Sequence, residues 1–130
     1  AGPCYYHYLV DGYDPFAQQM EFLRGLAAQD YPVWAVATQD MLWNAYQANK
    51  SGFGSGISAM PSVHVSIACL FMFLAWEYGP RQRLFFTLFA ILIMIGSVLL
   101  LWHYAIDGYL AGAVTYIIWI AAGRFMKEEK

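Results

Sequence analysis

Apolar residues gather in three long runs in the second half of the chain, with short polar stretches between them. The runs cover about residues 63–78, 84–102 and 109–125. A helix that crosses the hydrocarbon core of a bilayer needs about 20 apolar residues. The second run supplies nineteen residues, interrupted only by one Thr, one Gly and one Ser. The pattern predicts an all-α integral membrane protein with three transmembrane helices.

Residues 1–57 have a different pattern, in which apolar positions recur at helical spacing but no run is long enough to span a bilayer. Asp14 with Pro15 starts a predicted helix through about Ala28, and Asp-Tyr-Pro at residues 30–32 starts a second through about Asn49. The apolar sides of these two helices comprise, for the first, Phe16, Met20, Leu23 and Leu26 or Ala27, and for the second, Trp34, Met41, Leu42, Ala45 and Tyr46.

Aromatic residues indicate where these two helices lie. Trp and Tyr are enriched at the membrane–water boundary, and Trp34, Trp43 and Tyr46 all fall on the second predicted helix. We therefore expect an interfacial or extracytoplasmic helical region over residues 1–57 and a transmembrane core over residues 58–130. A small soluble cap with an aromatic core fits the same residues.

Composition supports the membrane assignment. The chain has 130 residues, of which 60% are hydrophobic and 12% charged, and a soluble domain of this length is seldom so apolar. The net charge of −2 leaves no basic surface for nucleic acid. Two cysteines do not make a disulfide framework. The chain begins at Ala1 rather than Met, so we expect a piece of a longer protein.

Basic residues predict the orientation in the membrane. They follow the first and the third apolar runs: Arg81, Arg83, Arg124, Lys127 and Lys130. Three consecutive spans place both groups on one side, and Lys and Arg mark the cytoplasmic side. Residues 1–62 and 103–108 then lie on the extracytoplasmic side, which brings His64 and His103 to the same surface.

The stretch from Gly56 to His64 is the first candidate for chemistry. Small residues lead into Pro61, which suits the first turn of a helix because its missing N–H has no partner there in any case. Such a helix end binds anions, and Ser62 and His64 add a hydroxyl and an imidazole. An ordinary helix start with one interfacial histidine fits these residues equally well.

His103 and Asp107 are the second candidate. They stand four residues apart and share one face of a helical turn. A carboxylate beside an imidazole fixes its tautomer and stabilises the imidazolium, although the two side chains would also make a structural pair between helix ends. With His64 as an acid and a helix N-terminus for the anion, these are the parts that phosphoryl transfer needs. The scheme requires no metal.

These residues carry a resemblance to a known family. Ala-Met-Pro-Ser-Val-His at residues 59–64 resembles the second signature of the type-2 phosphatidic acid phosphatase superfamily, and His-Tyr-Ala-Ile-Asp-Gly at residues 103–108, with Gly112 beyond, resembles the third. The residues of the two motifs are closer to those of the branch that includes inositol phosphorylceramide synthases and related bacterial membrane proteins. The resemblance covers residues 56–115 well.

The resemblance implies a helical bundle, usually of six spans, that acts on a lipid phosphate or phosphodiester without a metal or other cofactor. Three spans therefore suggest that upstream transmembrane helices are missing. His103 would be the nucleophile, Asp107 its orienting partner and His64 the acid and base. Ser62 and neighbouring backbone N–H groups, that of Val63 among them, would hold the phosphate in an active site on the periplasmic or lumenal side.

Two departures from the family pattern concern the phosphate-binding cations. The chain has no Arg-Pro for the first signature, and Gly96 and Ser97 stand where the family has Ser-Arg. The synthase-like branch also tends to lack these cations. Lys50, or less plausibly Arg24, is a candidate replacement on the same side of the membrane, although a solvated lysine fits as well.

Two further classes stay open. His64 and His103 fit the axial ligands of a haem-binding membrane helix bundle, but Asp107 and Ser62 have no part in haem ligation. In a catalytically silent membrane scaffold the motifs would be vestigial. The leading hypothesis is a membrane phosphatase or phosphotransferase with a lipid phosphate as substrate, membrane lipids around it and no nucleic acid partner.

Overall fold

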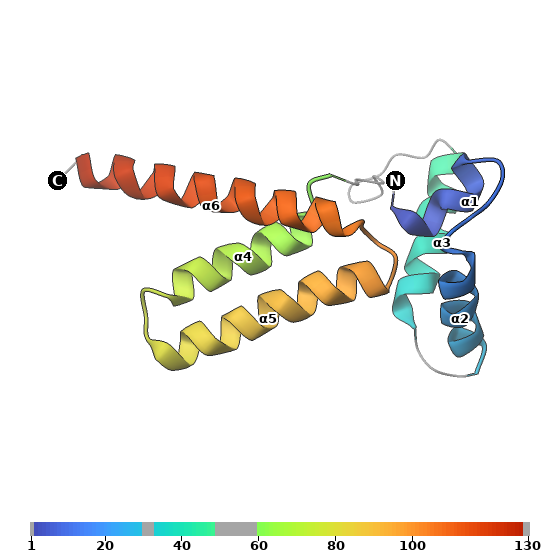
Figure 1. The fold of residues 1–130 in the computed structure, drawn as a ribbon, viewed down its shortest axis with the longest axis horizontal. Helices are drawn as coiled ribbons and strands as arrows, with labels where there is room; N and C mark the ends of the chain where they lie inside the picture. The colour runs from blue at the N-terminus through green and yellow to red at the C-terminus, as the bar shows by residue number, and fades with distance from the viewer. Residues whose placement is uncertain (1, 30–32, 49–59, 129–130) are drawn as a thin grey trace. The chain divides into compact units, whose positions relative to one another are not determined.

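The computed structural model describes residues 2–29, 33–48 and 60–128. Their backbone is helical and contains no strand. In chain order the elements are η1 (Pro3–Tyr5), α1 (Tyr6–Leu9), α2 (Ala17–Ala28), α3 (Trp34–Gln47), α4 (Val63–Ala75), α5 (Pro80–Leu99) and α6 (Ala105–Glu128) (Figure 1). This is the all-α class that the hydrophobic pattern predicts.

The chain forms two compact units. Unit 1 comprises Ala1–Ala59 together with the short segment Leu99–Trp102, and unit 2 comprises Met60–Val98 and His103–Lys130. The N-terminal unit thus includes the last residue of α5 and the three residues that follow it.

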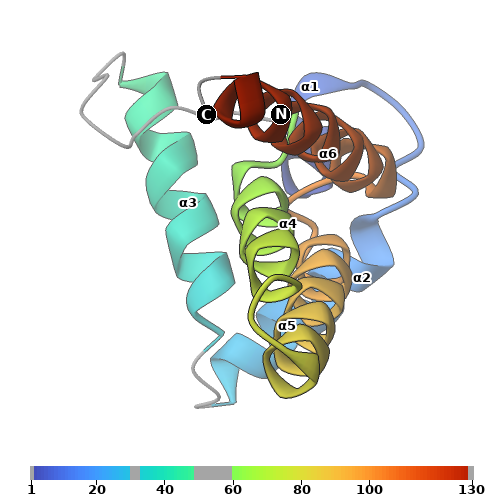
Figure 2. The ribbon, with the colours of Figure 1, turned by 90° about the vertical axis from the view of Figure 1, so that its left-hand side faces the viewer.

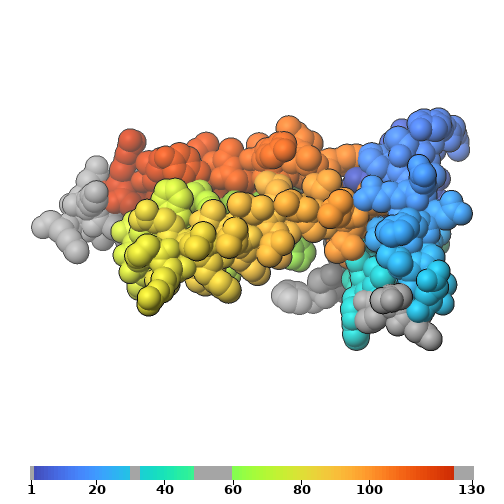
Figure 3. Space-filling model, turned by 60° about the horizontal axis from the view of Figure 1, so that its bottom comes forward, coloured from blue at the N-terminus to red at the C-terminus, as the bar shows by residue number. Residues whose placement is uncertain are grey.

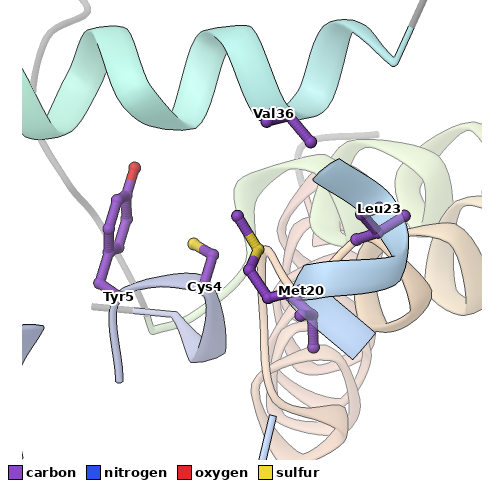
Figure 4. Close-up of a cluster of buried hydrophobic side chains, with 6 residues drawn as sticks. Cys4, Tyr5, Met20, Leu23 and Val36 are labelled. Carbon is purple, nitrogen blue, oxygen red and sulfur yellow. The ribbon is translucent and has the colours of Figure 1, made fainter. Parts of the chain in front are cut away.

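Unit 1 is built around a cluster of buried apolar side chains from η1, α2, α3 and the Leu99–Trp102 segment: Cys4, Tyr5, Met20, Leu23, Val36 and Leu101 (Figure 4). Burial raises the pKa of the Cys4 thiol to about 11. The thiol therefore stays neutral at physiological pH and packs as a small apolar group.

The two helices predicted in this region are present, with shorter bounds. α2 begins at Ala17 rather than beside Asp14, because the Asp14 carboxylate accepts the N–H of Phe16 at 2.8 Å in a turn before the helix. Met20 and Leu23 are buried, as their spacing predicts. The predicted start of the second helix, residues 30–32, lies outside the described residues.

The buried face of α3 differs from the predicted one. Val36 and Gln39 are buried, while Trp34, Met41 and Tyr46 of the predicted apolar side are exposed. Trp43 is only partly buried, where its ring stacks on those of Tyr5 and Tyr8 with centroids 5.3 and 4.4 Å away. A polar residue thus takes a core position, and exposed aromatic side chains of the kind that favour a membrane boundary remain on the surface of unit 1.

Unit 2 contains the apolar helices, with bounds that differ from the predicted ones. α5 and the Ala105–Arg124 part of α6 are each 20 residues and long and apolar enough to cross a membrane. α4 has only 13 residues, or about 20 Å at ~1.5 Å per residue, so the first of the three predicted spans, residues 63–78, is present as a shorter apolar helix. α6 starts at Ala105, four residues before the predicted 109.

α4 and α6 pack side by side and run in parallel (Figures 1 and 2). The ring of Phe73 lies 5.5 Å from that of Tyr116. A Cβ built on Gly112 would lie 3.7 Å from Cys69 Sγ, and one on Gly108 would lie 3.8 Å from Val65. The sequence separation between Cys69 and Gly112 equals that between Val65 and Gly108. The two helices therefore advance in the same direction, and their first turns lie at the same end.

α5 contacts α4 and α6 through long side chains. The rings of Phe71 and Phe86 are 6.0 Å apart, and the Arg83 guanidinium lies 5.2 Å above the Trp76 ring. The α5 segment forms much of the face shown in Figure 3. Its exposed apolar side chains include Leu84, Phe85, Leu88, Leu92, Ile95 and Leu99. In a membrane protein such a surface suits contact with lipid or other apolar helices.

Candidate active site

Ser62 is the N-cap of α4. It is fully buried, has an extended backbone, and its Oγ accepts the N–H of Val65 at 3.5 Å. Pro61 therefore precedes the helix and does not form its first turn as predicted. The first-turn N–H groups of Val63 and His64 have no partner inside a helix, and both side chains are exposed.

His103 and Asp107 lie at the start of α6, where both are buried, at 7% and 2% exposure. The Nδ1 of His103 lies 3.8 Å from the Oδ2 of Asp107, which is ion-pair distance but too long for a direct hydrogen bond. The same Oδ2 accepts the backbone N–H of Tyr104 at 3.0 Å. Asp107 therefore faces the imidazole while it also caps its own helix.

The capping contact explains why α6 begins where it does. Asp107 is the third residue of the helix, and its bond to the N–H of Tyr104 is one half of a capping box. A carboxylate in the first turn also interacts favourably with the helix dipole. The residue at the cap position is Tyr rather than the Ser or Thr of the usual capping box, so the sequence did not predict this earlier helix start.

The backbone of His103 is held as well. Its N–H donates to the carbonyl of Ser97 at 3.2 Å, across the connection between α5 and α6. Ser97 in turn donates its hydroxyl to the carbonyl of Met94 at 2.9 Å. Ser97 thus supports the histidine backbone, a role that the sequence pattern did not suggest.

The parallel packing of α4 and α6 brings the two motifs together. Val65 on α4 lies beside Gly108 on α6. Because the helices are parallel, His64 and Ser62, which precede Val65, lie at the level of the first turn of α6. Small residues of α6 face α4 at this level, where a Cβ on Gly108 would lie 3.8 Å from Val65 and one on Gly112 would lie 3.7 Å from Cys69. These small residues are Gly108, Ala111 and Gly112, and this packing role of a Gly-x-x-x-Gly pattern was not anticipated.

The candidate phosphate-binding cations are not part of this group. Lys50 lies outside the described residues. Arg24 lies in unit 1, where its guanidinium is 3.5 Å from the carboxylate of Asp40 on α3 and both side chains are exposed. In the described residues of unit 2, the side chains at the two helix starts that carry the candidate chemistry are Ser62, His64, His103 and Asp107, and none of these four is a Lys or Arg.

Apolar helices with an imidazole and a carboxylate at one end are features of a membrane protein with a candidate acid–base site. Comparison with protein families identifies the class of protein, because the profile of the PAP2 superfamily matches residues 1–122. The chain belongs to this superfamily. No curated protein and no solved structure matches it.

Membership of the PAP2 superfamily indicates the general type of activity. PAP2 superfamily members are typically phosphatases that act on phosphate esters, so the family points to activity of the lipid-phosphate phosphatase type. The candidate membrane helices and the family together indicate a membrane protein. The match also extends through the first fifty residues, which the motif resemblance did not cover.

Proposed function

We propose that this chain is a membrane-embedded phosphatase or phosphotransferase that acts on a lipid phosphate or phosphodiester through a phosphohistidine at His103. The observation that carries the proposal is the buried His103–Asp107 pair at the start of α6, beside the parallel start of α4. Burying ionisable groups at the end of apolar helices costs free energy, and groups buried there commonly mark a functional site.

In the first step, Nε2 of His103 attacks the phosphorus atom. Nδ1 faces Asp107, so the carboxylate favours the tautomer with the proton on Nδ1 and leaves the lone pair of Nε2 for attack. A P–N bond forms and the bond from phosphorus to the leaving oxygen breaks. His64, in its protonated form, gives its proton to that oxygen.

In the second step, neutral His64 removes a proton from a water molecule or an alcohol. The resulting oxygen attacks phosphorus, the P–N bond breaks, and His103 regains its lone pair. The exposed position of His64 allows an acceptor to reach it. Water gives a phosphatase and a lipid or sugar alcohol gives a phosphotransferase.

The phosphate oxygens are held at the N-terminus of α4. The N–H groups of Val63 and His64 point out of the first turn at the positive end of the helix dipole. Ser62 fixes this turn through its bond to Val65 and offers a hydroxyl. Lys50 is proposed as an additional cation, and its contribution is tested by Lys50→Met.

The experiment is turnover of a panel of lipid phosphates and phosphodiesters, with and without alcohol acceptors, by the purified chain in lipid nanodiscs. His103→Ala and His64→Ala should each abolish turnover, and vanadate, a phosphate mimic, should inhibit the parent. EDTA should leave the rate unchanged because no step uses a metal. Full turnover in His103→Ala would exclude the phosphohistidine.

The same preparation separates the two other classes. A haem protein would show a Soret band that His64→Ala and His103→Ala remove. A catalytically silent scaffold would hydrolyse no member of the panel although the chain is folded. The superfamily match favours the enzyme over both.

A further inference from the structure

The short segment Leu99–Trp102 leaves unit 2 at the end of α5 and is bound by unit 1. Three consecutive backbone carbonyls in it each accept a hydrogen bond. Gln19 Nε2 donates to the carbonyl of Leu99 at 2.7 Å, Gln39 Nε2 to that of Leu100 at 2.8 Å, and the N–H of Cys4 to that of Leu101 at 3.0 Å. The carbonyl of Leu99, at the end of α5, has no intrahelical partner, and those of Leu100 and Leu101 lie beyond the helix, so groups from the N-terminal region provide the partners of all three.

Packing holds the same segment. Leu101 adopts a left-handed backbone conformation with φ of 59°, which residues with a Cβ disfavour. Its side chain is only 2% exposed and lies in the cluster with Cys4 and Met20. At Gly2 the backbone approaches the carbonyl of Trp102 so closely that no Cβ would fit. The conformation that ends α5 is therefore maintained by unit 1.

The next residue after this segment is His103. Its N–H is bonded to Ser97 in unit 2, while the peptide on its other side leads directly to Trp102, in the segment that unit 1 binds. We propose that Gln39 is a positioning residue for His103, which acts through the Leu100 carbonyl to fix the backbone from which the imidazole projects. The inference rests on the proposed function of His103.

Gln39 is an unusual residue for its place. It is 1% exposed and, with Val36, forms the buried side of α3, and its Oε1 has no hydrogen-bond partner among the described residues. A buried acceptor without a partner destabilises a fold, so an apolar side chain of the same length would serve the core equally well. What Gln39 alone supplies is a donor aimed at Leu100.

The test compares Gln39→Met with the matched control Gln19→Met in the full chain. Methionine keeps the length of the side chain, removes the donor and also removes the unpartnered Oε1, so the thermal midpoint should stay close to that of the parent. We expect kcat for a lipid phosphate to fall on the order of ten- to a hundredfold, because small displacements of a reacting group have effects of this size, with KM unchanged. Gln19→Met should stay near the parent, since its exposed bond to Leu99 is replaced by water.

A second readout follows the imidazole itself. Diethyl pyrocarbonate modifies accessible histidines, and mass spectrometry resolves His103 from His64. Gln39→Met should speed modification of the buried His103 and leave that of the exposed His64 unchanged. If Gln39→Met does not fold, Gln39→Leu takes its place. An unchanged kcat, or a fall in kcat matched by a fall in the thermal midpoint, would overturn the inference.

The two proposals fail in different ways. Turnover that survives His103→Ala removes the phosphohistidine, and the positioning role falls with it. Turnover that is lost in His103→Ala but complete in Gln39→Met leaves the phosphohistidine in place and removes only the role of Gln39.

Discussion

Asp107 has two tasks that a single oxygen performs. Its Oδ2 faces Nδ1 of His103 and accepts the N–H of Tyr104. The first contact serves the chemistry proposed for His103, and the second caps the start of α6. The sequence motif gives only the first, because a His and an Asp four residues apart reveal no backbone bond.

This double role predicts how Asp107→Asn behaves. The Asn carbonyl oxygen can still accept the N–H of Tyr104, so the helix start should survive. The amide NH₂ then faces His103 and favours the tautomer with its proton on Nε2, which removes the attacking lone pair. We expect kcat to fall on the order of 10²- to 10⁴-fold with little change in the thermal midpoint.

The control for that prediction is Asp107→Ala, which removes both contacts. It should lower the thermal midpoint as well as kcat, because loss of a helix cap costs about 1 kcal/mol. Steady-state kinetics and thermal unfolding in the same detergent provide the comparison. Equal kcat for Asp107→Asn and the parent would show that the carboxylate does not orient His103.

At the scale of the elements, the apolar runs predict which helices exist but not where they end. α5 stops at Leu99, three residues before the end of its run at residue 102, because Leu101 turns into a left-handed conformation and is bound by unit 1. Hydropathy cannot register this, since Leu101 is as apolar as its neighbours. The early start of α6 depends on the bond from the Tyr104 N–H to Asp107, which hydropathy does not register either.

The same limit applies to helix pairing. Both motifs were expected at one membrane surface, but the charge argument could not show that α4 and α6 are direct neighbours. Their pairing depends on the small residues that line the contact, and small residues also occur in apolar helices at positions that touch no other helix. Gln39 was not predicted at all, because a glutamine in an amphipathic helix is normally assigned to the exposed side.

The close approach at the start of α6 predicts the effect of Gly108→Ala. The added Cβ would meet Sδ and Cε at the far end of the flexible Met94 side chain on α5, which can move aside at low cost, so the loss should lie near the lower end of the ~1 to 3 kcal/mol usual for an overpacked contact. Met94→Ala in the same chain should restore part of this loss. Thermal unfolding of the single and double variants measures both effects.

Gly112→Ala is the matched control for this substitution. It adds the same methyl group one helical turn later, where the nearest atom is Cys69 Sγ at 3.7 Å, an ordinary contact distance. Because alanine is also the better helix former, we expect Gly112→Ala to be neutral or slightly stabilising. If both variants lose equal stability, the close contact lies elsewhere than at Gly108.

At the scale of the whole molecule, we propose that the site faces the extracytoplasmic side of the membrane. Arg83 at the start of α5 donates to the carbonyl of Trp76 at 3.4 Å and lies over its ring, an arrangement suited to a membrane boundary. The basic residues of this turn and of the C-terminus favour the cytoplasmic side. His64 and His103 stand at the opposite ends of the same apolar helices.

This topology predicts the labelling of two introduced cysteines. Asp11→Cys lies in the exposed connection between α1 and α2, and Gln82→Cys lies in the exposed first turn of α5. In intact cells, a membrane-impermeant maleimide should label Asp11→Cys and should label Gln82→Cys only after the membrane is permeabilised. The parent chain, with Cys4 and Cys69, gives the background. The reverse pattern would place the site in the cytoplasm, where its lipid phosphate would have to be drawn from the inner leaflet.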